Sequence, residues 1–107
     1  MVVLRNEIWL IQLEPVVGAE IRKIRPCLVV SPNPVNKFLK TVVVVPITST
    51  IKPYPTRINC EIEGKNGQLV IDQIRAIDKS RLVKPLGVLQ ESTCIEVYSL
   101  LKQFFSL

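Results

Sequence analysis

The sequence predicts a small, mainly β domain: a twisted, barrel-like antiparallel sheet closed by one C-terminal α-helix. Between residues 7 and 83, five to seven short runs of apolar and β-branched residues follow one another, separated by proline, glycine and asparagine. After residue 91, apolar residues recur at helical spacing instead. Connections between the runs are short, which favours antiparallel neighbours. With 107 residues and a hydrophobic fraction of 48%, the chain is expected to form a single domain over residues 1–107.

The expected strands are bounded by turn residues. EIWLIQL is stopped by Pro15 and Gly18, and CLVVS is stopped by the turn signal Pro32-Asn33-Pro34. TVVVVPI is so rich in valine that we expect a central strand buried on both faces. Gly64-Lys65-Asn66-Gly67 is expected to be a hairpin connection, and Pro85 ends the last short strands. In order, the runs are 7–13, 27–31, 41–47, 57–63, 68–71, 74–77 and 81–83.

Two segments show clear periodicity. In the run 57–63, three apolar residues alternate with polar ones, so Ile58, Cys60 and Ile62 are expected to face the core. Residues 92–105 are expected to form an amphipathic helix, with Glu91 near its start and Lys102 near its end, as the helix dipole favours. Its wide apolar face consists of Cys94, Val97, Tyr98, Leu101, Phe104 and Phe105.

Composition narrows the classes of function. The net charge of +5 favours a polyanionic partner, nucleic acid or an anionic membrane surface, although ordinary solubility charge would give the same value. The chain has no histidine, which excludes histidine-based acid–base chemistry and a Ser-His-Asp triad. Three scattered cysteines are typical of reduced thiols in a core. The first residues are too charged for a signal peptide or membrane span, so we expect a cytoplasmic protein without a membrane partner.

Three groups of polar residues interrupt the apolar pattern. Glu20, Arg22, Lys23 and Arg25 lie just before a buried strand, and Pro26 favours an extended backbone at Arg25. A guanidinium held in this way suits phosphate binding, but a solvated basic loop would have the same sequence.

The second group, Thr48-Ser49-Thr50, follows the valine-rich strand and suits either a turn or hydrogen-bond donors beside a site. The third group runs from Asp72 and Gln73 to Asp78 and Arg81. Its carboxylates could pair with the neighbouring arginines, and although two carboxylates would fit a metal site, their spacing matches no ligand pattern. We therefore expect no metal.

Taken in order, these motifs resemble the MazF/PemK (Kid) family of toxins from bacterial type II toxin–antitoxin systems. The matching features are Gly18-x-Glu20, Arg25-Pro26 before a strand ending in Ser-Pro, VVVVPITS at 42–49, and DQIRAID at 72–78 followed by Arg81. The similarity extends from about residue 5 to about residue 105. It implies an SH3-like barrel with a C-terminal helix, assembled as a homodimer.

The resemblance also implies an activity. Most members are endoribonucleases that cut single-stranded mRNA at short sequences without a metal or other cofactor, and so inhibit translation and growth. The substrate's 2′-hydroxyl is the nucleophile, and the products carry a 2′,3′-cyclic phosphate and a 5′-hydroxyl. The family's catalytic positions fall on Arg25, Thr48 and Glu20. The RNA-binding positions that we expect are Arg22, Lys23, Ser49, Tyr54, Asp72, Gln73 and Arg81.

One departure from the family concerns the position before the loop glutamate. Some members have histidine there, whereas this chain has Ala19, so its catalysis must depend on the arginine–threonine arrangement. We expect Arg25 to bind the scissile phosphate, Thr48 to donate a hydrogen bond to it, and Glu20 to act as acid or base. The same basic surface would bind an acidic antitoxin segment that folds on binding. The alternatives are a toxin of this fold that acts on DNA gyrase and a non-catalytic RNA-binding regulator.

Overall fold

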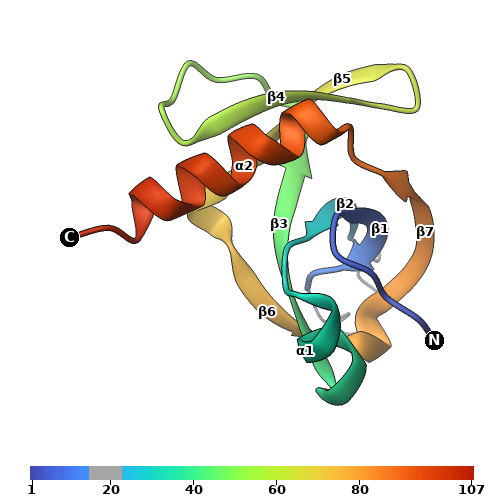
Figure 1. Cartoon of the computed structure of the whole chain (residues 1–107). Helices are drawn as coiled ribbons and strands as arrows, with labels where there is room; N and C mark the ends of the chain where they lie inside the picture. Colours follow the sequence, from blue (N-terminus) through green and yellow to red (C-terminus); the bar gives the residue numbers. More distant parts are fainter. Residues whose placement is uncertain (15–22) are drawn as a thin grey trace.

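The computed structural model describes residues 1–14 and 23–107. Its seven strands in these ranges form one curled sheet in the order β4-β5-β3-β2-β1-β7, with β6 paired to β3 (Figure 1). The predicted fold class, a mainly β domain with a C-terminal helix, is confirmed. No helix in the described ranges is long and apolar enough to cross a membrane. The elements are β1 (Glu7–Gln12), β2 (Ile24–Val29), α1 (Asn33–Phe38), β3 (Thr41–Thr48), β4 (Arg57–Ile62), β5 (Lys65–Val70), β6 (Arg75–Asp78), β7 (Leu82–Val88) and α2 (Glu91–Phe104).

Strand β3 organises the sheet, as its valine-rich sequence predicts. Val44 lies opposite Val29 of β2 on one side and Arg75 of β6 on the other. Nearer its end, β3 pairs with β5 instead, where Thr48 lies opposite Gln68. The strand therefore pairs with three neighbours, and the sheet curls around it (Figure 1).

Side-chain alternation gives the sheet a hydrophobic cluster on each face. Leu28 belongs to the cluster that α2 covers, whereas Cys27 and Val29 belong to the opposite cluster with Trp9 and Ile11. Successive residues of a strand point to opposite faces, so the end of β2, from Cys27 to Val29, is buried on both sides. Burying each such aliphatic side chain contributes about 1.5–3 kcal/mol, which makes the two clusters the main source of stability.

Helix α2 matches the predicted 92–105 to within one residue at each end, with Glu91 in its first turn and Lys102 in its last. Its residues Cys94 and Val97 are buried. The prediction is wrong for Phe104 and Phe105, which are 45% and 66% exposed. Figure 1 shows the reason: the C-terminal turn of α2 projects away from the sheet that covers the rest of the helix.

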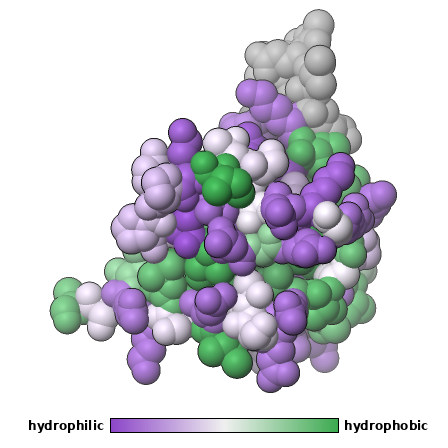
Figure 2. Space-filling view, turned by 90° about the horizontal axis from the view of Figure 1, so that it is seen from above, coloured by the Kyte–Doolittle hydropathy of each residue, from purple (hydrophilic) through white to green (hydrophobic). Residues whose placement is uncertain are grey.

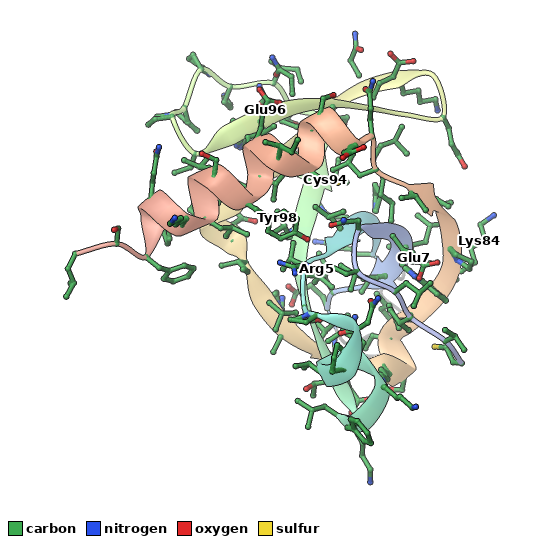
Figure 3. The ribbon with its side chains drawn as sticks, in the orientation of Figure 1. Arg5, Glu7, Lys84, Cys94, Glu96 and Tyr98 are labelled. Carbon is green, nitrogen blue, oxygen red and sulfur yellow. The ribbon has the colours of Figure 1, made fainter. Side chains whose placement is uncertain are left out.

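The N-terminal segment is tied to α2 by one polar cluster (Figure 3). Arg5 Nε donates to the hydroxyl of Tyr98 over 3.1 Å, and the Tyr98 hydroxyl donates to Asn6 Oδ1 over 2.6 Å. The Arg5 guanidinium also lies 4.2 Å from the centroid of the Tyr98 ring. These contacts join the beginning of the chain to its last helix.

A short helix stands where the sequence predicts a turn. Pro32 is the N-cap of α1 and Pro34 lies in its first turn, where the missing N–H of proline costs nothing. The buried Asn36 donates from Nδ2 to the carbonyl of Ser31 over 2.9 Å, and Val43 N donates to Ser31 Oγ over 3.0 Å. This network joins α1 to β3, a long-range contact that no local pattern reports.

The boundaries of β2 and β7 differ from the prediction. Strand β2 begins at Ile24 rather than residue 27, because Arg25 pairs with Ile11 of β1. Strand β7 continues through Pro85 and Gly87, where irregular register with β1 accommodates the proline. The alternation expected in β4 is confirmed, since Ile58 is buried while Asn59 and Glu61 are exposed.

The hairpin between β4 and β5 is tighter than predicted. Its loop is Glu63-Gly64, and both residues have positive φ, 52° and 77°, as a two-residue turn of type I′ requires. Lys65, Asn66 and Gly67 therefore belong to β5 and not to the turn. This shift brings them to the site described next.

Candidate functional site

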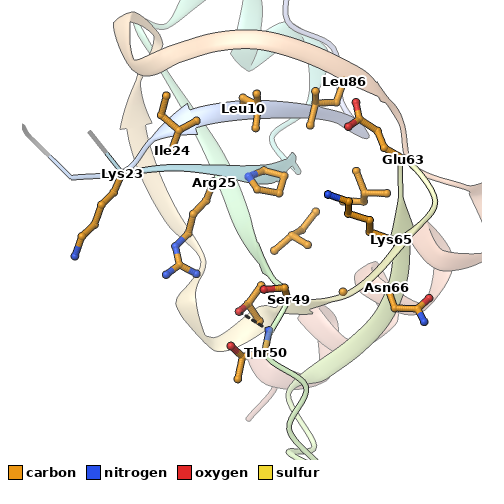
Figure 4. Close-up of a pocket in the computed structure, with 15 residues that line it drawn as sticks. Leu10, Lys23, Ile24, Arg25, Ser49, Thr50, Glu63, Lys65, Asn66 and Leu86 are labelled. Carbon is orange, nitrogen blue, oxygen red and sulfur yellow. Dashed lines mark hydrogen bonds between the residues drawn. The ribbon is translucent and has the colours of Figure 1, made fainter. Parts of the chain in front are cut away.

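A cleft opens where β2 and β3 separate. The two strands form a ladder as far as Cys27 and Pro46, after which β3 continues alongside β5. The cleft has a volume of about 660 Å³ (Figure 4). Its walls consist of Leu10, Lys23, Ile24, Arg25, Pro26, Ile47, Thr48, Ser49, Thr50, Ile62, Glu63, Lys65, Asn66, Gly67 and Leu86.

Arg25 projects from β2 into this cleft, toward the side where Ser49 and Thr50 lie (Figure 4). The backbone of Arg25 pairs with Ile11 of β1. The side chain is therefore positioned by a regular strand rather than by a loop. The guanidinium is exposed, and no carboxylate within residues 1–14 and 23–107 pairs with it. Its five donors are therefore open to an anion from solvent, as far as the described residues go.

Thr48 ends β3 on the opposite wall. Its Oγ1 accepts a hydrogen bond from the backbone N–H of Thr50 over 3.1 Å. This bond uses an acceptor lone pair and leaves the hydroxyl hydrogen available to donate. The two interpretations of Thr48-Ser49-Thr50, turn former and donor beside a site, are thus compatible in one geometry.

Arg25 and Thr48 lie on the same face of the sheet. Cys27 and Val29 of β2 share a cluster with Val44 of β3, and steps of two residues lead from these to Arg25 and Thr48. Both residues also line the cleft between the separating strands.

Among the described lining residues the cleft is basic, because Lys23, Arg25 and Lys65 face it with Glu63 as the one carboxylate. This charge favours an anionic ligand over a cation. Within the described part of the chain, no group of three His, Cys, Asp or Glu residues could hold a metal ion. The charges thus suit phosphate.

The cysteine nearest to Arg25 is not a nucleophile. Burial raises the pKa of the Cys27 thiol to about 12, although Arg25 and Arg75 act in the opposite direction. At neutral pH this thiol stays protonated, and a protonated thiol is a poor nucleophile. Cys27, Cys60 and Cys94 are all free cysteines, and only Cys60 is partly exposed.

The structure brings four of the predicted site residues together: Arg25, Thr48, Lys23 and Ser49 all line the cleft. Glu20 and Arg22 lie outside the described residues, so their predicted roles stay predictions. Tyr54 is 53% exposed and does not line the cleft; its ring lies 5.4 Å below the Arg57 guanidinium.

Asp72, Gln73 and Arg81 lie away from the cleft, in two short 3-10 helices, η1 (Ile71–Gln73) and η2 (Lys79–Arg81). Arg81 has a structural task, since its Nη1 donates to the carbonyl of Leu13 over 2.9 Å at the end of β1. The ion pairs that the sequence left open, between the Asp72 and Asp78 carboxylates and the neighbouring arginines Arg75 and Arg81, are not seen. The ion pair among the described residues joins Arg75 to Glu14 instead, over 3.7 Å.

Sequence reasoning missed the β5 wall of the cleft, formed by Lys65, Asn66 and Gly67. A Cβ added at Gly67 would lie 3.0 Å from the carbonyl oxygen of Thr48 and 3.3 Å from Ile47 Cγ2. Glycine is thus required for β5 to approach the end of β3 closely. The glycine at position 67 was a signal for this close approach, but it was overlooked because Gly67 was assigned to the turn.

The fold is that of solved structures of MazF proteins. The structure of MazF from Deinococcus radiodurans matches with a TM-score of 0.84 and 26% identity, over 100% of this chain and 99% of that one. A MazE-MazF structure from the same organism matches with a TM-score of 0.85 and 26% identity, over 97% and 96% of the two chains. A curated relative, the endoribonuclease MazF of Staphylococcus epidermidis, is 36% identical over 99 residues, 87% of this chain and 82% of the relative.

The model of the PemK-like, MazF-like toxins of type II toxin–antitoxin systems matches residues 4–105. The chain belongs to this family.

Proposed function

We propose that this chain is the toxin of a type II toxin–antitoxin pair and an endoribonuclease that cuts single-stranded mRNA at a short sequence. The observation that carries the proposal is the placement of Arg25 and Thr48 on two walls of one basic cleft. The family match and the curated relatives named as endoribonucleases support the same activity. Cleavage of mRNA in the cytoplasm would stop translation and growth.

The proposed reaction is transesterification within the RNA. The 2′-hydroxyl oxygen forms a bond to the neighbouring phosphorus while the bond from phosphorus to the 5′-oxygen breaks. The products are a 2′,3′-cyclic phosphate and a 5′-hydroxyl, so one proton leaves the 2′-oxygen and one reaches the 5′-oxygen. The step needs no metal, because positioning and charge stabilisation can supply much of the rate.

Arg25 is the proposed phosphate-binding residue. Its exposed planar guanidinium can donate two parallel hydrogen bonds to the non-bridging oxygens, on which charge builds as the nucleophile attacks. Because Arg25 belongs to β2, its position is set by the ladder with β1. An arginine holds its proton too firmly to be the general acid, so Arg25 acts by electrostatic stabilisation.

Thr48 is the proposed second donor to the same phosphate. Its hydroxyl approaches from the β3 wall, while its lone pair is occupied by Thr50 N–H. Proton transfer is assigned to Glu20, whose carboxylate is the acid or base that the sequence offers in the motif. Lys23 and Lys65 add positive charge along the cleft, so RNA binding is expected to weaken steeply with salt.

The proposed partners are an antitoxin and a second copy of the chain. The structural relatives include a MazE-MazF structure, which supports a cognate antitoxin whose acidic segment folds on this basic surface. A homodimer is supported by exposed apolar side chains on α2, Ile95 and Phe104. Hydrophobic patches between hydrophilic side chains are visible on the face shown in Figure 2.

The test is an RNA cleavage assay in EDTA with wild type, Arg25→Ala and Lys84→Ala. Lys84 is an exposed cation on β7 outside the cleft, so its loss controls for total charge. We expect cuts at one short sequence with 5′-hydroxyl ends, lost in Arg25→Ala and retained in Lys84→Ala. Intact RNA with folded wild-type protein would overturn the proposal and make DNA gyrase or simple RNA binding the next target to test.

A further inference from the structure

A buried amide next to the cleft has no task in the chemistry described so far. Gln68 is 5% exposed and belongs to β5, and the three residues that follow it are buried and apolar: Leu69 and Val70 of β5 and Ile71 of η1. An apolar side chain would suit this run better, because burying an amide is unfavourable unless all its hydrogen bonds are made. A glutamine at this position therefore needs hydrogen-bond partners for both its amide oxygen and its amide nitrogen.

Gln68 has those partners on both ends of its amide. Its Oε1 accepts from the backbone N–H of Lys52 over 3.0 Å and from Arg57 Nη1 over 2.9 Å. Its Nε2 donates to Asn59 Oδ1 over 2.9 Å. One buried side chain thus joins β5 to β4 and to the connection between β3 and β4.

Arg57 extends the same network along that connection, residues 49–56. The Nη1 that donates to Gln68 also donates to the carbonyl of Thr50 over 2.9 Å. The backbone N–H of Arg57 donates to the carbonyl of Tyr54 over 3.1 Å, and its guanidinium lies over the Tyr54 ring. The segment is thereby fixed at Thr50, Lys52 and Tyr54, although it has no regular secondary structure.

The network ends at the candidate catalytic threonine. Thr50, held by Arg57, donates its backbone N–H to Thr48 Oγ1. Gln68 itself lies opposite Thr48 in the β3–β5 ladder. The orientation of the Thr48 hydroxyl is therefore coupled to Gln68 through two short routes, one along the ladder and one through Arg57 and Thr50.

We propose that Gln68 and Arg57 are positioning residues that hold residues 48–54 in the shape that receives RNA. The proposal rests on the proposed function for its substrate, but the anchoring itself is a property of the loop. A pre-formed wall reduces the entropy lost on binding and keeps the Thr48 hydroxyl aimed at the phosphate. Neither side chain lines the cleft, so loss of the anchor should leave RNA binding nearly unchanged. It should instead lower the cleavage rate of bound RNA, because the Thr48 hydroxyl is no longer held in place.

The test compares Gln68→Leu with Gln68→Glu. Leucine keeps approximate size but removes every hydrogen bond of the side chain. Glutamate keeps the acceptor for Lys52 and Arg57, loses the donor to Asn59, and adds a negative charge that the Arg57 guanidinium can pair with. Val97→Ala is the control, because it truncates a fully buried side chain on α2 and lowers stability without touching the loop. Amide hydrogen exchange at Lys52 and Thr50 is measured by NMR for each variant, followed by kcat and KM on a short single-stranded RNA.

In Gln68→Leu we expect exchange at Lys52 to accelerate at least tenfold, and kcat to fall by about 10- to 100-fold with little change in KM. Gln68→Glu should restore slow exchange and most of kcat. Val97→Ala is measured at a temperature as far below its own melting point as the wild type is below its melting point. It should keep slow exchange at Lys52 and an unchanged kcat.

Unchanged exchange at Lys52 in Gln68→Leu would overturn the anchor, as would an equal loss of kcat in Val97→Ala. Failure of Gln68→Glu to restore slow exchange would also overturn it. If the wild type cuts no RNA, the proposed function fails, while the exchange comparison still decides whether Gln68 holds the loop.

Discussion

Arg25 and Thr48 occupy positions that would pair if β2 and β3 continued their ladder for two more residues. The last pair, Cys27 with Pro46, sets a register that places Arg25 opposite Thr48. The strands separate instead, Arg25 stays paired with Ile11 of β1, and Thr48 pairs with Gln68 of β5. Two donors are thus held by two separate strand pairs, with space for a ligand between them. A rigid sheet edge of this kind suits a reaction that depends on positioning.

Arg25→Lys is expected to distinguish the effect of the positive charge at this position from that of the planar guanidinium. Lysine keeps the positive charge but loses the planar fork that can bind two phosphate oxygens at once. We expect RNA affinity to change little, while kcat falls by about 10²- to 10³-fold, as for loss of one preorganised donor. Single-turnover cleavage and binding at equal salt measure the two effects, and a fully active Arg25→Lys would show that charge alone suffices.

Thr48→Val and Thr48→Ser are expected to differ strongly. Valine matches threonine in shape but removes the hydroxyl, and with it both the donor to the phosphate and the acceptor for Thr50 N–H. Serine keeps both functions. We expect Thr48→Val to lose about 10²-fold in kcat and Thr48→Ser to stay within a few-fold. Equal activity in both variants would remove Thr48 from the proposed site.

Gly67→Ala is expected to impair the cleft through packing alone. The added methyl would lie 3.0 Å from the Thr48 carbonyl oxygen, so β5 and the end of β3 must move apart. We expect a cost of about 1–3 kcal/mol in the free energy of unfolding, together with slower cleavage.

The matched control for Gly67→Ala is Gly64→Asn. Gly64 has a φ of +77°, which asparagine tolerates, and no atom lies within 4 Å of an added Cβ. Urea unfolding and cleavage assays of both variants would check the prediction. It is contradicted if Gly67→Ala is as stable and active as Gly64→Asn.

The sequence predicts those parts of the fold that local periodicity determines. The valine run of β3 and the amphipathic spacing of α2 are such cases, and both are confirmed. Arg25 and Thr48 could be named because they lie in recognisable motifs beside strands. Elements that depend on longer-range contacts were missed, such as α1, whose partner Ser31 also accepts the backbone N–H of Val43 in β3.

The same reason explains the missing β5 wall of the cleft. The tight hairpin at Glu63-Gly64 is set by pairing between β4 and β5, and this pairing moves Lys65 and Gly67 from the turn into the strand. Gln68 could not be recognised either, because its partners Lys52 and Arg57 are 16 and 11 residues away. Such contacts become visible only once the register is known.

Tyr98→Phe is expected to weaken the attachment of the N-terminal segment to α2 without affecting catalysis. The change removes the hydrogen bond to Asn6 and the acceptor for Arg5, while the aromatic ring stays in place. We expect a loss of about 1–2 kcal/mol in the free energy of unfolding. Chemical denaturation gives the stability and an RNA assay well below the melting temperature gives the activity; an unchanged denaturation midpoint would contradict the prediction.

Asp78 is expected to make the stability depend on pH in acid. Its Oδ1 accepts the backbone N–H of Ser80 over 2.8 Å, and this bond, together with that to the Ser80 side chain, lowers the pKa of the carboxyl below its ordinary value of 3.8. A lowered pKa means that the unfolded chain takes up the proton first as the pH falls. The stabilisation is therefore complete above pH 3.8 and is lost as the pH falls through the lower pKa of the folded state.

Asp78→Asn is the variant that tests this dependence, because asparagine keeps an acceptor for Ser80 N–H but does not titrate. We expect the wild type to be the more stable protein at pH 6 and the difference to shrink steadily below pH 3.8, where the unfolded wild type begins to bind its proton. Urea midpoints of both proteins between pH 2 and pH 6 measure the difference. If it stays constant or grows toward low pH, the Asp78–Ser80 bond does not stabilise the charged carboxylate.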